Sequence, residues 1–87
     1  RTLRTVSKAD PRMARLLDEH PVLDQWGGWK LSETATVYVL TAGGWLKRLL
    51  LVVDKESLDL LLVATGNRLL AGWSEVEPEQ VGFALRG

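Results

Sequence analysis

Short apolar runs separated by turn residues fill the stretch from residue 34 to residue 73. The runs are rich in Leu and Val, and Gly, Asn and Asp stand between them. This pattern is typical of consecutive β-strands joined by short connections. We place three turns in the stretch, at Gly43-Gly44, at Asp54 to Ser57 and at Gly66-Asn67, because Gly and Asn tolerate the positive φ angles of tight turns. The sequence therefore predicts four antiparallel strands.

These turns sort the side chains onto two faces of the sheet, because successive residues of a strand point to opposite sides. In this register Tyr38 pairs with Leu49, Leu51 with Leu60, and Leu60 with Trp73. The predicted core face then holds Tyr38, Leu40, Leu49, Leu51, Val53, Leu58, Leu60, Leu62, Leu69 and Trp73, with Lys47 as an exception. The opposite face, called the second face below, holds Val37, Val39, Leu46, Leu50, Val52, Leu61, Val63 and Leu70, with Arg48, Asp59 and Arg68 among them. Both faces are mostly apolar, whereas an antiparallel sheet with one side in water alternates more cleanly.

A short helix is predicted before the strands. Asp10 can cap its start, and Pro11 suits the first helical position, where no backbone N–H is needed. The apolar residues that follow recur at the spacing of one helix face: Met13, Leu16 and Leu17. The helix ends at His20, because the residue before Pro21 avoids helical backbone angles. Three turns are too few for a stable isolated helix, so this one must pack on the sheet.

Two further segments complete the predicted fold. Alternation at Trp29, Leu31 and Glu33 indicates a short edge strand. Residues 54–66 also admit a helix capped by Asp54 and closed by Gly66. That helix would be apolar almost all round, which suits only a fully buried helix, so the hairpin is favoured. We predict an α+β domain over residues 1–87, with a short N-terminal helix packed on a mostly antiparallel β-meander of four to five strands.

Composition restricts the classes of protein. The chain has 87 residues, of which 46% are hydrophobic and 25% charged, as in ordinary globular domains. It has no cysteine, which excludes disulfides and thiol chemistry and fits a reducing compartment, so we expect a cytoplasmic protein. The longest apolar runs have five residues, against about 18 for a membrane span, so we expect none. The chain begins with Arg, so it can be a fragment of a longer protein.

Candidate chemical groups are few. His20 is the only histidine, and its place at a helix end favours an interaction with the last carbonyl groups. Asp54, Glu56 and Asp59 lack the glycine and the final glutamate of a calcium-binding loop, so we assign them to a turn. No phosphate-binding glycine motif is present. We therefore expect no catalytic residue, no metal site, no cofactor and no enzymatic activity.

The two apolar faces lead to the main functional prediction. One short helix covers only part of one face, and the remaining segments are brief. Monomers rarely leave more than a few hundred Å² of contiguous apolar surface bare. We therefore expect a non-catalytic interaction module that forms a homo-oligomer or binds a protein partner. The predicted interface residues are Val37, Val39, Leu50, Val52, Leu61 and Val63.

Two alternatives remain open. Arg1, Arg4 and Lys8 form a basic N-terminal arm that could contact the phosphates of a nucleic acid. The net charge of zero and the absence of aromatic residues from the arm make this the weaker prediction. The second alternative is a small-molecule or peptide site lined by Trp, since Trp26 and Trp29 flank a double glycine and Trp45 follows another. Filling of the core and of an interface is the more common role of Trp.

Overall fold

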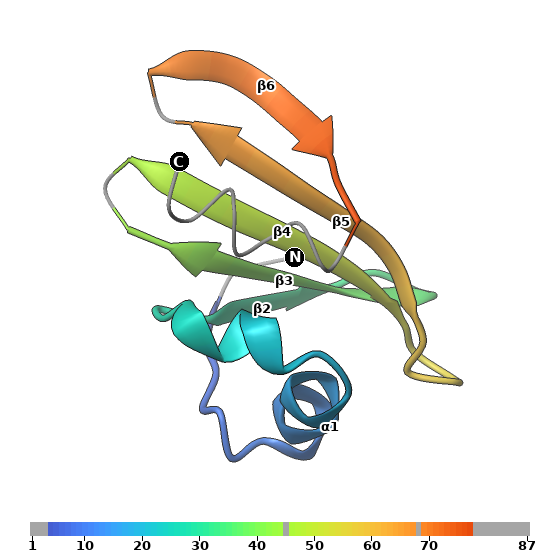
Figure 1. The fold of residues 1–87 in the computed structure, drawn as a ribbon. Coiled ribbons are helices and arrows are strands. Elements are labelled where there is room, and N and C mark those ends of the chain that lie inside the picture. The colour runs from blue at the N-terminus through green and yellow to red at the C-terminus, as the bar shows by residue number, and fades with distance from the viewer. Residues whose placement is uncertain (1–3, 45, 68, 78–87) are drawn as a thin grey trace.

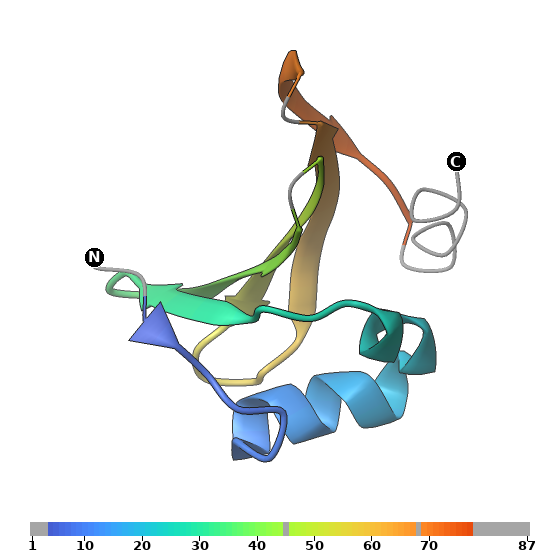
Figure 2. The ribbon, with the colours of Figure 1, turned by 90° about the vertical axis from the view of Figure 1, so that its left-hand side faces the viewer.

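The computed structural model describes residues 4–44, 46–67 and 69–77 of the chain (Figure 1). The elements in order are β1 (Arg4–Thr5), α1 (Pro11–Glu19), the 3-10 helix η1 (Pro21–Gln25), β2 (Lys30–Glu33), β3 (Val37–Gly43), β4 (Lys47–Asp54), β5 (Leu60–Asn67) and β6 (Leu70–Glu75). The strands form one antiparallel sheet in the order β1-β2-β3-β4-β5-β6. Figure 2 shows α1 and η1 together on one side of this sheet. The α+β meander is confirmed, with six strands in place of four to five.

Helix α1 forms as its end signals predict. The Asp10 carboxylate accepts a hydrogen bond from the backbone N–H of Arg12 at 2.9 Å, and Pro11 is the first helical residue. At the other end, the backbone N–H of His20 donates to the carbonyl of Leu16 at 2.8 Å. Met13 and Leu16 are fully buried and face the sheet core. Burial of each such side chain contributes roughly 2 kcal/mol, which offsets the weak stability of a helix of this length.

The core lies between the helices and the core face of the sheet. Its buried residues are Met13, Leu16, Leu23, Trp26, Trp29, Leu31, Leu40, Ala42, Leu49, Leu51, Val53 and Val63. Residues from β2, β3, β4 and β5 therefore share one cluster with both helices. Leu40, Leu49, Leu51 and Val53 confirm the predicted core face of β3 and β4.

The first hairpin has a longer connection than the predicted two-residue turn. Tyr38 pairs with Val53, four residues beyond the predicted partner Leu49. Strand β3 continues through Gly43, which pairs with Arg48 and has a φ of 125°. The backbone N–H of Gly44 donates to the carbonyl of Lys47 at 3.1 Å and closes the loop. Because the pairing of β3 with β4 differs from the prediction by an even number of residues, each side chain of these strands still lies on its predicted face.

A β-bulge in β5 overturns part of the predicted second face. Val53 pairs with Leu60, but the neighbouring Val52 pairs with Leu62, so Leu61 has no partner on β4. One extra residue reverses the direction of every later side chain in the strand. Val63 therefore faces the core and is only 3% exposed, whereas the prediction placed it on the second face. Leu62 moves the other way, to the second face beside Val52.

The chain turns between β4 and β5 near Asp54 to Ser57, as predicted, and the alternative helix is excluded, but the connection runs on to Asp59, so Val53 pairs with Leu60 instead of the predicted Leu58. The Asp54 carboxylate accepts hydrogen bonds from the backbone N–H groups of Glu56 and Ser57 and from the Ser57 hydroxyl, at 2.8 to 3.1 Å. These donors lower the pKa of the Asp54 carboxyl, led by the Ser57 backbone N–H. Asp54 therefore shapes the turn, as the sequence indicates.

The third hairpin turns later than predicted. Asn67 pairs with Leu70 and Gly66 with Trp73, with a register shift between Gly66 and Asn67. Trp73 thus lies on the second face and is 45% exposed, and Leu69 at the turn is 73% exposed, although the prediction placed both on the core face. The physical reason for the position of Trp73 is the bulge in β5, which places Gly66 and therefore its partner Trp73 on the second face. At Gly66 a Cβ atom would be only 3.0 Å from the Trp73 ring. A residue without a side chain leaves space for the indole of the neighbouring strand.

Candidate interaction surface

The second face has an uncharged centre built from three neighbouring strands. In one row Val39, Val52 and Leu62 pair across the sheet, and in the next row Thr41, Leu50 and Ala64 do so. These six residues are the central patch. Five of them are partly exposed and Ala64 is buried. Each of the six is next in sequence to a buried core residue, Leu40, Leu51 or Val63. Because successive side chains of a strand point to opposite sides, all six point to the second face.

The predicted interface residues fall into three groups. Val39, Leu50 and Val52 lie in the central patch, and Val37 lies at its border, paired with Asp54. Leu61 sits at the bulge and is 55% exposed. Val63 is buried in the core and does not belong to this surface.

The second face also carries a contact between Arg48 and Trp73 that the sequence did not predict. The Arg48 guanidinium lies over the Trp73 ring, 5.5 Å from its centroid. Arg48 pairs with Gly66, and Gly66 pairs with Trp73, so the two side chains meet across the glycine. A glycine inside an apolar strand signals such a close approach, but the prediction used Gly66 as a turn residue. The pair places one positive charge and one large ring beside the central patch.

The basic arm is engaged within the described chain. Arg4 lies 3.8 Å from the Glu33 carboxylate, and Lys8 lies 3.0 Å from the Asp24 carboxylate and 3.0 Å from its carbonyl oxygen. Arg1 lies outside the described residues. Both described cations therefore face carboxylates, which lowers their attraction for phosphate.

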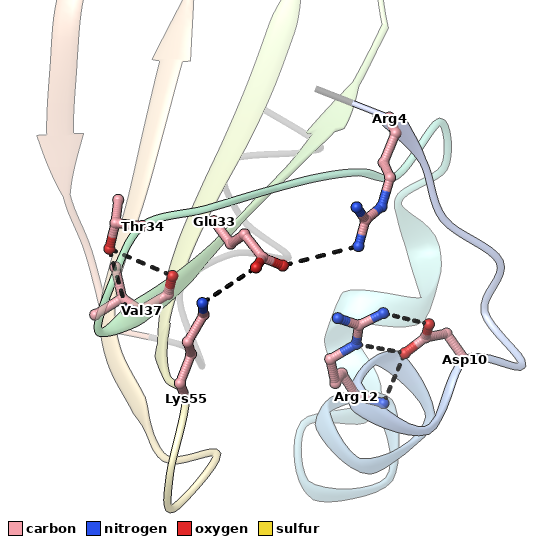
Figure 3. Close-up of polar contacts among 7 residues, drawn as sticks. All are labelled: Arg4, Asp10, Arg12, Glu33, Thr34, Val37 and Lys55. Atoms are coloured by element: carbon pink, nitrogen blue, oxygen red, sulfur yellow. Dashed lines mark hydrogen bonds and ion pairs between the residues drawn. The ribbon is translucent and has the colours of Figure 1, made fainter. Parts of the chain in front are cut away.

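Figure 3 shows polar contacts at the start of α1, between Asp10 and Arg12, and within the sheet, where Glu33 contacts Arg4 and Lys55. Arg12 forms two side-chain hydrogen bonds with the Asp10 carboxylate, at 2.7 and 2.9 Å, and these hold the pKa of that carboxyl at about 2. Arg12 and Lys55 lie 4.9 and 5.5 Å from the centroid of the Tyr38 ring. Lys55 also donates to Glu33 at 3.1 Å and lowers the pKa of that carboxyl. This network has a structural role, because it fixes the start of α1 against β3 and β2.

The tryptophans do not gather at one site in the part of the chain that the structure describes. Trp26 and Trp29 are buried in the core, and their indole N–H groups have no hydrogen-bond partner. Trp73 lies on the opposite side of the sheet, and Trp45 lies outside the described residues. An open cleft of about 260 Å³ borders Trp26, Gly43 and Lys47, but only one tryptophan lines it among residues 4–44, 46–67 and 69–77.

Other candidate groups are separated as well. Within the described residues, no three His, Asp or Glu side chains are grouped closely enough to hold a metal ion. His20 ends α1, as its position predicts. None of the described helices is long and apolar enough to cross a membrane.

Comparisons of the chain with protein-family models, with curated proteins and with solved structures found no match.

Proposed function

We propose that this protein is a non-catalytic interaction module that associates with a second copy of itself through the second face of the sheet. The observation that carries the proposal is the central patch, where Val39, Leu50, Val52 and Leu62 stay partly exposed in two adjacent rows of three uncharged residues. The helices lie on the other side of the sheet (Figure 2), so the described helices do not cover this patch. Burial of apolar area is the main driving force of association.

The size of the face suits a modest dimer. Strands of seven or eight residues are about 25 Å long at roughly 3.3 Å per residue. Six strands at about 4.8 Å spacing are about 24 Å wide. The face therefore measures roughly 600 Å², against about 800 Å² per partner in a standard interface.

Charge supports a second copy as the occupant. A two-fold dimer brings the same patch of both subunits together, so a charged residue at its centre would lie close to the same charge on the other subunit. The central patch carries none; Arg48 lies in the neighbouring row, held over Trp73, and Glu75 lies beside Ala64 at the edge of the patch. Two copies can therefore meet without like-charge repulsion at the centre.

Sedimentation velocity at high micromolar concentration tests the proposal. We expect a dimer that persists in high salt, because apolar burial is not screened by ions. Leu50→Lys places a charge in the central patch and should yield a monomer. Ala14→Lys, on the exposed side of α1, adds the same charge elsewhere and should leave the dimer intact. Val52→Thr, which keeps the β-branched shape, should weaken association while circular dichroism confirms the fold. A monomeric wild-type protein, or a dimer unchanged by both patch substitutions, would refute the proposal.

A further inference from the structure

A second surface borders the central patch and shares Leu62 with it. An open cleft of about 410 Å³ separates the end of α1 from the region where β5 begins and β6 ends. Its apolar lining includes Leu61, Leu62 and Val76. The volume is within the range of pockets that bind ligands and short segments. The cleft is thus large enough to take one or two side chains of a partner.

The β-bulge creates the apolar part of this cleft. Leu61 has no partner on β4 and is 55% exposed, so it projects an apolar side chain that a regular strand would have paired. Beyond β6, the backbone N–H of Val76 donates to the carbonyl of Val63 at 2.9 Å. This bond holds the segment after β6 beside the bulge. Val76 is therefore held at the cleft by a backbone contact, whereas Leu61 is exposed there because the bulge leaves it without a partner on β4.

The rim of the cleft is acidic. Glu19, Asp59, Glu75 and Glu77 contribute four carboxylates, against His20 as the basic residue of the lining, and among the described residues no Lys or Arg lines the cleft. Glu19 lies 3.4 Å from Arg15, but this pair is exposed and therefore weak. These groups come from three separate parts of the chain, at the end of α1, before β5 and around the end of β6. Their common field attracts cations to the apolar lining.

We propose that this cleft binds a short cationic segment of a partner protein, in which Lys or Arg residues alternate with apolar residues. Apolar side chains of the segment contact Leu61 and Val76, and its cations approach Asp59 and Glu75. Charge complementarity selects this occupant, because the carboxylates would repel a nucleic acid or an acidic segment. The proposal does not depend on self-association, whose centre is at Leu50 and Val52.

Fluorescence anisotropy with a labelled peptide of alternating Lys and Leu tests this inference. Binding to the wild-type protein should exceed binding of a Lys-Ser peptide, which lacks the apolar residues, and of a Glu-Leu peptide, which reverses the charge. The double variant Asp59→Asn, Glu75→Gln should weaken binding of the Lys-Leu peptide roughly five- to tenfold. Leu61→Ser should weaken it as well.

A matched control separates the cleft from net charge. Asp18→Asn with Glu56→Gln removes the same two charges from exposed positions outside the lining, and binding should stay within twofold of wild type. Equal weakening by both double variants would show attraction by net charge alone and overturn the inference. Equal binding of the Lys-Leu and Lys-Ser peptides, or an unchanged affinity of Leu61→Ser, would also overturn it.

Discussion

Two adjacent glycines, Gly43 at the end of β3 and Gly44 in the loop after it, should respond very differently to the same substitution. Gly43 has a φ of 125°, and a Cβ atom there would collide with the carbonyl oxygen of Lys47 and lie 2.8 Å from Cα of Arg48. Both neighbours are backbone atoms of the paired strand β4, so they cannot move without opening the hairpin. At Gly44, a Cβ atom would meet no atom within 4 Å. Gly43→Ala should therefore be strongly destabilising and Gly44→Ala close to neutral.

The size of the effect follows from two costs at Gly43. A backbone conformation that L-residues rarely adopt costs about 1–3 kcal/mol, and forced displacement of packed atoms costs a further 1–3 kcal/mol. The sum, about 2–6 kcal/mol, is a large part of the roughly 4–13 kcal/mol expected for a domain of 87 residues. For Gly44→Ala we expect a change within about 1 kcal/mol, because the unfolded chain also loses freedom.

Equilibrium unfolding in urea, followed by Trp fluorescence, measures both variants against the wild type. Gly43→Ala should lower the midpoint by more than 1 M, since the slope for a small protein is about 1–2 kcal/mol/M. The slope itself reports whether the native state has stayed compact. If the two variants unfold within about 1 kcal/mol of each other, the geometry described for the β3–β4 loop is wrong.

Two other predictions concern the network at α1 and the core. The Asp10 carboxyl has a folded pKa of about 2 against its usual 3.8, so its contribution to stability is present above pH 3.8 and is lost as pH falls through about 2. Asp10→Asn keeps the cap acceptor but should cost about 1 kcal/mol at neutral pH and nothing below pH 2, as urea unfolding at both pH values would show. Leu51→Ala, in the core, should cost about 2–5 kcal/mol, whereas Leu61→Ala at the bulge should cost less than about 1 kcal/mol in thermal unfolding. A pH-independent cost of Asp10→Asn, or similar costs at Leu51 and Leu61, would contradict these assignments.

Local signals made the elements predictable, whereas register depended on contacts beyond them. Asp10, Pro11 and Pro21 mark both ends of α1 in the sequence, and the Asp54 turn likewise carries its own acceptor. In contrast, β4 and β5 carry apolar residues on both faces, so alternation does not decide which side faces the core. The sequence of such a run does not indicate that Leu61 is an extra residue in the pairing of β5 with β4.

The residues of the candidate interaction surface were predictable in part for the same reason. Val39, Leu50 and Val52 were placed correctly because the error in the first hairpin was even and preserved their face. Val63 and Trp73 were misplaced because their positions depend on the bulge and on the approach of an indole to Gly66. The acidic cleft joins α1 to the ends of β5 and β6, and no sequence pattern relates these distant segments.

The unpaired Leu61 also determines where this chain can change its length. Loss of that single residue would bring Leu60 and Leu62 into direct succession opposite Val53 and Val52, and each remaining side chain of β5 would keep its present face. Deletion of one residue elsewhere in β5 would move every following core side chain of the strand to the second face, and every following side chain of the second face into the core. The hairpin therefore contains one position at which evolution can shorten it while preserving the core, and that position is also exposed at the surface.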